Sequence, residues 1–143
     1  MPAKAFAQLW LSLIQVLDDE FFRLDSHGMP LGSFALICRG LIQEPSLDKA
    51  LRQCLGNFGL FLRDLRGSIS VRGSRTVISV QSSIADPLTR GYAEETYLVL
   101  VVGLLCWLGG RRLQIERTEL AIARPPLEDD TLLWGADLRL GSG

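Results

Sequence analysis

The longest apolar run of the chain spans residues 97–108, twelve positions that are all apolar or glycine. A helix that crosses a membrane needs about 20 apolar residues, whereas runs of about 10–14 are typical of buried core helices. Residues 94–95 are both glutamate and residues 111–112 both arginine, an order of charges that complements a helix dipole. The run therefore predicts the central helix of a soluble domain, covered on nearly all sides and ending at the glycine pair 109–110.

A different pattern, in which side chains alternate every two residues, occupies residues 67–81. Ile69 and Val71 alternate with polar residues before an Arg-Gly-Ser-Arg turn, and Ile78 and Val80 resume the alternation. This period indicates an antiparallel hairpin with one buried face.

Helical spacing of apolar residues predicts a first helix over about residues 5–23 and a second over residues 33–43. Ser33 is expected to cap the second helix, and Ser46 to cap a third. The rest of the chain adds weaker signals, which are a loop at 83–90, strands around 120–122 and 138–140, and a helical turn around 132–134. These elements predict one α+β domain over residues 1–143, with four or more helices packed with a small antiparallel sheet containing a β-hairpin.

Composition excludes several classes of protein. The net charge is −1, whereas a nucleic-acid-binding surface needs clustered Lys and Arg. The cysteines Cys38, Cys54 and Cys106 are an odd number without a Cys-x-x-Cys pair. We expect them to be free thiols in a reducing cytoplasm. The N-terminal residues lack the pattern of a signal peptide.

Candidate catalytic groups are scarce. Residues 18–20, Asp-Asp-Glu, would point to different sides of a helix because each residue turns the chain by about 100°, so we expect a solvated helix end. His27 is the only histidine, in a glycine-containing turn without a neighbouring nucleophile. The dispersed cysteines do not have the spacing of a zinc site. We therefore expect no enzyme, no catalytic residue, no metal and no cofactor.

Three side chains are candidates for contact with a small ligand. Arg39 lies opposite the apolar face of the second helix, which favours exposure, but it would anchor an anionic ligand if that helix were covered on both sides. Tyr97 opens the apolar run and offers its hydroxyl to a ligand or to a backbone carbonyl. Trp107, near the end of the run, is expected in the core or as the apolar wall of a pocket.

Short motifs spread along the chain support a family assignment. They are Asp-Asp-Glu-Phe-Phe at 18–22, Met-Pro-Leu-Gly-Ser-Phe at 29–34, Ser-Leu-Asp-Lys-Ala-Leu at 46–51, the hairpin at 67–81, and Cys-Trp-Leu-Gly-Gly-Arg-Arg at 106–112. In this order and spacing they resemble the N-terminal sensor (arabinose-binding-like) domain of AraC/XylS-type bacterial transcription regulators, over nearly the whole chain.

The resemblance implies a small-molecule effector of unknown identity and a cytoplasmic homodimer. It also implies a helix-turn-helix domain that binds DNA, and this sequence contains nothing like one. The chain is therefore expected to be a sensor fragment that by itself binds neither nucleic acid nor membrane. Its first helix, with Phe6, Trp10 and Phe22, is the expected dimer contact. The alternative is a protein-interaction or dimerisation module without a ligand.

Overall fold

The computed structural model describes residues 3–73, 75–110, 118–120 and 138–140. In chain order the elements are α1 (Ala3–Leu17), α2 (Ser33–Ile42), α3 (Leu47–Phe61), β1 (Leu65–Arg72), β2 (Arg75–Ser82), α4 (Pro87–Gly109), β3 (Thr118–Leu120) and β4 (Leu138–Leu140). The described part of the chain is thus α+β, with four helices and an antiparallel two-stranded sheet.

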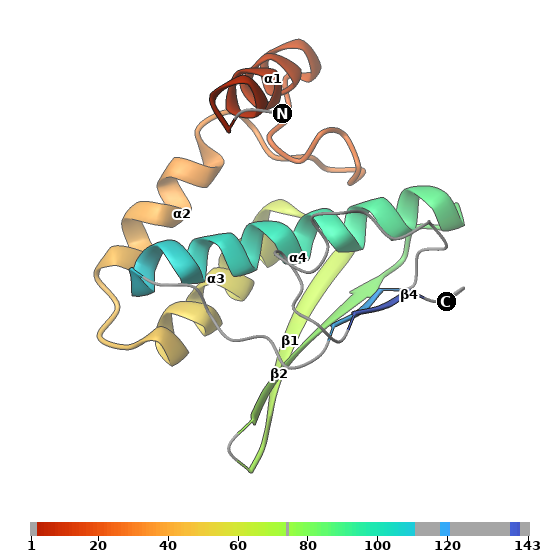
Figure 1. Ribbon diagram of the computed structural model, residues 1–143. Coiled ribbons are helices and arrows are strands. Elements are labelled where there is room, and N and C mark those ends of the chain that lie inside the picture. Colours follow the sequence, from red (N-terminus) through yellow and green to blue (C-terminus); the bar gives the residue numbers. More distant parts are fainter. Residues whose placement is uncertain (1–2, 74, 111–117, 121–137, 141–143) are drawn as a thin grey trace.

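The antiparallel sheet is formed by β1 and β2, which pair from Leu65↔Ser82 to Arg72↔Arg75. Ile69, Ile78 and Val80 pack against the core as the alternation predicts. Val71, also expected on the buried face, is exposed, because the distal end of the hairpin extends beyond the helices (Figure 1).

A second pair of strands, β3 and β4, runs parallel from Thr118↔Leu138 to Leu120↔Leu140. The strands expected near Leu120 and over residues 138–140 are therefore present. The expected features at Ile122 and at residues 132–134 lie outside the described residues.

Helix α4 crosses the middle of the molecule, with α2 and α3 beside one end of it and the hairpin across its other side (Figure 1). It packs against α3, α2 and β2, and α3 also packs against β1. Helix α1 lies apart from this group and reaches it through residues 18–32 (Figure 1).

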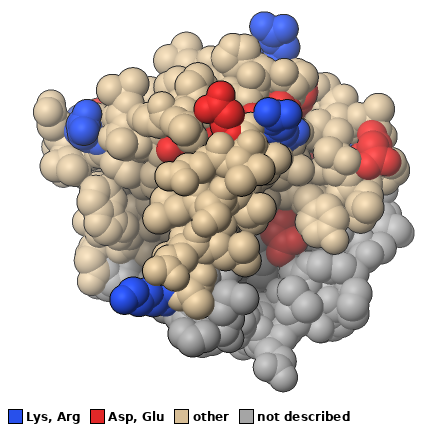
Figure 2. Space-filling view, turned by 90° about the horizontal axis from the view of Figure 1, so that it is seen from above, with Lys and Arg blue, Asp and Glu red and all other residues tan. Residues whose placement is uncertain are grey.

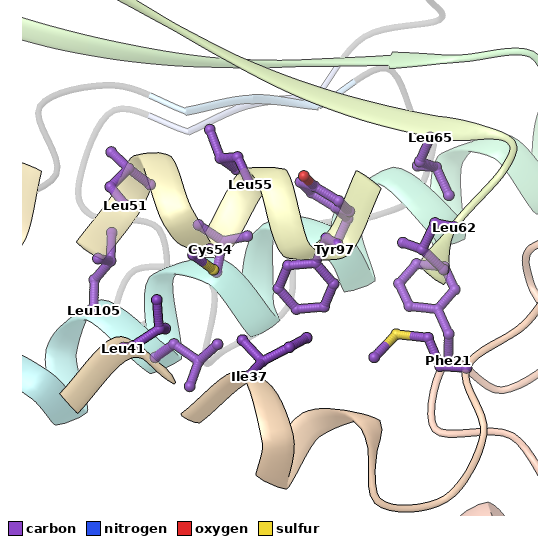
Figure 3. Packing of buried hydrophobic residues seen from close by; sticks show 14 of the residues in the cluster. Phe21, Ile37, Leu41, Leu51, Cys54, Leu55, Leu62, Leu65, Tyr97 and Leu105 are labelled. Carbon is purple, nitrogen blue, oxygen red and sulfur yellow. The ribbon is translucent and has the colours of Figure 1, made fainter. Parts of the chain in front are cut away.

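The core lies between α2, α3, α4 and the start of β1 (Figure 3). Its buried members are Phe21, Met29, Ile37, Leu41, Ala50, Leu51, Cys54, Leu55, Phe58, Leu62, Leu65, Ala93, Tyr97, Val101, Leu104 and Leu105. Phe21 and Met29 belong to neither a helix nor a strand, so the segment after α1 contributes directly to the core.

Helix α4 begins earlier than the sequence suggests. Asp86 caps it by accepting hydrogen bonds from the Thr89 amide (2.9 Å) and hydroxyl (2.7 Å), and Pro87 occupies its first turn. The second half of the loop expected over residues 83–90 is therefore helical, and residues 94–95 lie inside the helix. The helix ends as predicted, at Gly110 with a left-handed φ of 66°.

Only one side of α4 is fully buried, so the expectation of a helix covered on nearly all sides is wrong. Val101 is completely buried and Val102 only partly, while Leu88 and Trp107 are more than half exposed. By length and composition α4 is able to cross a membrane. Core helices of soluble proteins have the same composition, and the buried side of α4 forms part of this core.

Helix α1 ends at Leu17, six residues before the predicted end. Asp18, Phe22 and Arg23 have positive φ angles of 53°, 57° and 58°, a region that non-glycine residues adopt rarely. Residues 18–32, which we call the linker, therefore leave the helical path at once.

The helix caps differ from expectation at one of two sites. Ser46 caps α3 as predicted, with its Oγ accepting from the Lys49 amide at 3.2 Å. Ser33 is instead the first residue of α2, and its hydroxyl donates to the Pro30 carbonyl at 2.6 Å. Gly32 occupies the cap position with a φ of 97°, and the Phe34 amide donates to Glu20 Oε1 at 2.7 Å.

Candidate functional site

The linker is held by buried carboxylates. Asp19 is only 7% exposed, and its Oδ1 accepts hydrogen bonds from the amides of Phe21 (2.7 Å) and Met29 (2.9 Å). The expectation that residues 18–20 form a solvated helix end is therefore wrong for Asp19. A buried carboxylate is stabilised when backbone amides satisfy it, and here it closes the linker on itself.

A second buried carboxylate, Asp25, joins the linker to the junction between α3 and β1. Its oxygens accept from the amides of Arg63 (3.0 Å), Asp64 (2.7 Å) and His27 (2.8 Å). Burial alone would raise the pKa of Asp25, but the backbone hydrogen bonds outweigh it and hold that pKa below its ordinary value. Asp64 completes the junction by accepting from the Ser26 amide at 2.7 Å.

His27 also contacts this junction. Its Nδ1 lies 2.5 Å from the Phe61 carbonyl oxygen and 3.1 Å from the Gly28 carbonyl oxygen. Both partners are acceptors, so this geometry assigns the proton to Nδ1. The single histidine thus ties the linker to the end of α3.

Among the described residues no metal centre is indicated, and the buried thiol of Cys54 is held in its protonated form. No group of three or more His, Cys, Asp or Glu side chains is placed there to hold a metal ion. None of the three cysteines forms a disulfide. Burial raises the pKa of Cys54 to about 12, with the neighbouring Cys38 adding to the rise, so that thiol stays protonated and unreactive near neutral pH.

The three candidate ligand residues lie at separate places. Arg39 is exposed in the last turn of α2, and Trp107 is 55% exposed near the end of α4. Tyr97 is 1% exposed and packs its ring against Phe58, with centroids 5.4 Å apart. Ten residues of helix place Tyr97 about 15 Å from Trp107, so the structure does not bring these candidates into one pocket.

Two hollows open on the described surface. The first, which we call the α3–β1 hollow, has a volume of about 320 Å³ and lies between α3 and β1. Its lining is Arg52, Leu55, Gly56, Gly59, Arg66, Gly67, Ser68 and Ile69. Sequence reasoning missed this site, although Arg52, Gly56 and Gly59 follow helical spacing and share one face of α3.

The α1–α4 hollow, of about 340 Å³, lies under α1 and the linker. Its lining is almost entirely apolar: Leu9, Trp10, Leu13, Phe22, Leu24, Tyr92 and Thr96. Trp10 and Phe22 pack edge to face, with ring centroids 4.7 Å apart. None of the three candidate ligand residues lines either hollow.

Comparison with known proteins gives a family for the whole chain. The family model described as the arabinose-binding domain of AraC transcription regulator, N-term, matches residues 1–143. Neither the curated proteins nor the solved structures give a significant match. The family is a regulatory ligand-binding class and not an enzyme class, and this chain belongs to the N-terminal arabinose-binding domains of AraC transcription regulators.

Proposed function

We propose that this chain is the effector-binding and dimerisation domain of a cytoplasmic bacterial AraC-type transcription regulator. The match of the family model to residues 1–143 carries the proposal. A helix-turn-helix domain elsewhere in the full regulator would contact DNA, and this sensor alone would not. The effector binds one arrangement of the sensor more tightly and so shifts how two DNA-binding domains are presented.

The exposed surface of α1 supports dimerisation. Leu11 and Val16 are exposed, Val16 by 79%, and Lys4 is the only charged residue of the helix. The face of the molecule that carries α1 shows few charged side chains (Figure 2). Lys4, Gln8, Ser12 and Gln15 share one face of the helix, and beside it lie exposed apolar side chains that a second copy of the chain would cover through a symmetric contact.

The expected aromatic contact needs revision. Trp10 and Phe22 are half-buried against each other and line the α1–α4 hollow. We therefore assign the proposed dimer contact to the exposed apolar residues of α1, Leu11 and Val16 among them, and not to these two rings.

Native mass spectrometry of the purified chain tests both parts of the proposal. We expect a dimer, and added mass on a fraction of it where an effector is retained. L-arabinose is the first ligand to add back, followed by a panel of metabolites, with the melting temperature as the second readout.

A matched pair of variants tests the dimer surface. Leu11→Glu/Val16→Glu should give a monomer, while Leu60→Glu should remain dimeric, because Leu60 is 80% exposed on α3 and away from α1. A wild-type monomer at micromolar concentrations would remove the dimer contact from the proposal. The ligand-free interaction module, which the apolar surface of α1 also favours, would gain support from a dimer that retains no ligand and responds to none.

A further inference from the structure

The α3–β1 hollow contains two guanidinium groups with unused donors. Arg52 Nε pairs with Asp48 Oδ2 at 3.2 Å, and Arg66 Nη1 donates to the Gly59 carbonyl at 2.6 Å. Each guanidinium has five N–H donors, so most of them remain available at the rim of the hollow. Guanidinium groups bind carboxylates by paired, charge-assisted hydrogen bonds.

The wall between this hollow and the core is thin. Gly67, which lines the hollow, has no side chain. A Cβ added there would lie 2.4 Å from Tyr97 Oη and 2.8 Å from Leu55 Cδ2. Leu55 also lines the hollow, and Figure 3 shows the Tyr97 oxygen turned toward this side chain and the strand above it. The Tyr97 hydroxyl therefore lies directly behind two lining residues.

That hydroxyl has no hydrogen-bond partner among the described residues, although Tyr97 is 1% exposed. Buried hydroxyls are normally paired, and one that is not calls for an explanation. Burial raises the pKa of Tyr97 well above its ordinary value, while the approach of the Gly67 backbone amide to the hydroxyl and the nearby Arg66 charge oppose the rise. The group is thus a protonated hydroxyl that lies behind the wall of the hollow and donates to no described group.

We propose that the α3–β1 hollow binds a small organic acid, whose carboxylate pairs with Arg52 and Arg66 and which accepts a hydrogen bond from Tyr97 when Leu55 turns aside. Leu55 and Ile69 supply apolar contact for the body of the acid. The volume of about 320 Å³ is near the lower limit of small-molecule sites, which favours a compact ligand. This inference rests on the proposed effector-binding function and names the chemical class of its ligand.

The glycines make a direct test possible. Gly56, Gly59 and Gly67 line the hollow, while Gly32 and Gly40 lie on the linker and α2. The full chain, labelled with ¹⁵N only in glycine, is titrated with benzoate and, in parallel, with the isosteric neutral benzamide. We expect benzoate, and not benzamide, to shift the three hollow amides while the other two stay in place.

Substitutions then assign the donors. Arg52→Gln and Arg66→Gln should each weaken benzoate binding about tenfold, whereas Arg72→Gln, on the exposed end of β1, should leave it unchanged. Tyr97→Phe should fold as stably as wild type and still bind benzoate several-fold more weakly. A residue that only fills the core would not show this combination of intact stability and weaker binding.

Three results would overturn the inference. The first is an equal response to benzoate and benzamide, and the second is no response to benzoate up to about 10 mM. The third is full affinity in both arginine variants. Inorganic phosphate, added as a third ligand, shows whether binding to the hollow requires the apolar body of an organic acid or only its negative charge. If a neutral effector is retained in native mass spectrometry while benzoate fails, the acid site is wrong and the proposed sensor function stands.

Discussion

Asp25 Oδ2 accepts a 2.7 Å hydrogen bond from the backbone amide of Asp64, and so joins two segments 39 residues apart. Asp25 belongs to the linker that follows α1, and Asp64 immediately precedes β1, which lines the α3–β1 hollow. The carboxylate therefore joins the segment that follows the proposed dimer helix to the start of a strand that lines the proposed ligand site.

Removing the Asp25 carboxylate should be costly. Asp25→Ala leaves the amides of Arg63 and Asp64 without their partner in a site where Asp25 is only 5% exposed. We expect the free energy of unfolding to fall by about 3 kcal/mol, measured by urea denaturation. Asp48→Ala is the control, because its ion pair with Arg52 is exposed and should contribute less than about 1 kcal/mol. Equal losses in the two variants would contradict the assigned role.

The same carboxylate makes stability depend on pH. The pKa of Asp25 in the folded protein lies below its ordinary value of 3.8, so the unfolded chain takes up the proton first as pH falls. Its contribution is fully present well above pH 4, and it is lost as pH falls through the folded pKa. Asp25→Asn should therefore be less stable than wild type at neutral pH, and the difference should narrow below about pH 4. A difference that stays constant down to about pH 2 would show that ionisation is irrelevant there.

The sequence predicted the helices and the hairpin because their signal is local: side-chain periodicity of 3.6 or two residues. The end of α1 was missed because its cause is distant. Asp19 and Glu20 leave the helix to bind the amides of Met29 and Phe34, ten and fourteen residues further along the chain. Such a partner cannot be found from helical spacing.

The candidate site shows the same limit. The burial of Tyr97 follows from its place on the apolar side of α4, but its lack of a hydrogen-bond partner depends on where β1 lies. Arg52 and Arg66 are fourteen positions apart on different elements, and only the packing of α3 on β1 places both at one hollow. The roles of Arg39, Tyr97 and Trp107 in effector binding remain predictions.

The orientation of α4 can be tested at two adjacent valines. Val101 is fully buried, while Val102 is partly exposed. Val101→Ala should lower the free energy of unfolding by about 2 kcal/mol, and Val102→Ala by clearly less. Thermal and urea unfolding of both variants measure the difference, and the reverse order would mean that the helix is rotated from the position described. Val101→Asp should go further and give insoluble protein, because an unpaired buried carboxylate costs several kcal/mol.

The close approach of Gly67 to Tyr97 predicts a specific coupling. Gly67→Ala places a methyl group 2.4 Å from Tyr97 Oη, and overpacking of this kind costs about 1–3 kcal/mol. Tyr97→Phe removes that oxygen along with an unpaired buried hydroxyl, so by itself it should change stability little. In the double variant the new methyl group gains the space that the oxygen held, although Leu55 Cδ2 still lies 2.8 Å from it. The double variant should therefore recover about 1 kcal/mol of the loss in a urea-denaturation cycle, and strictly additive effects would show that β1 does not approach the tyrosine as described.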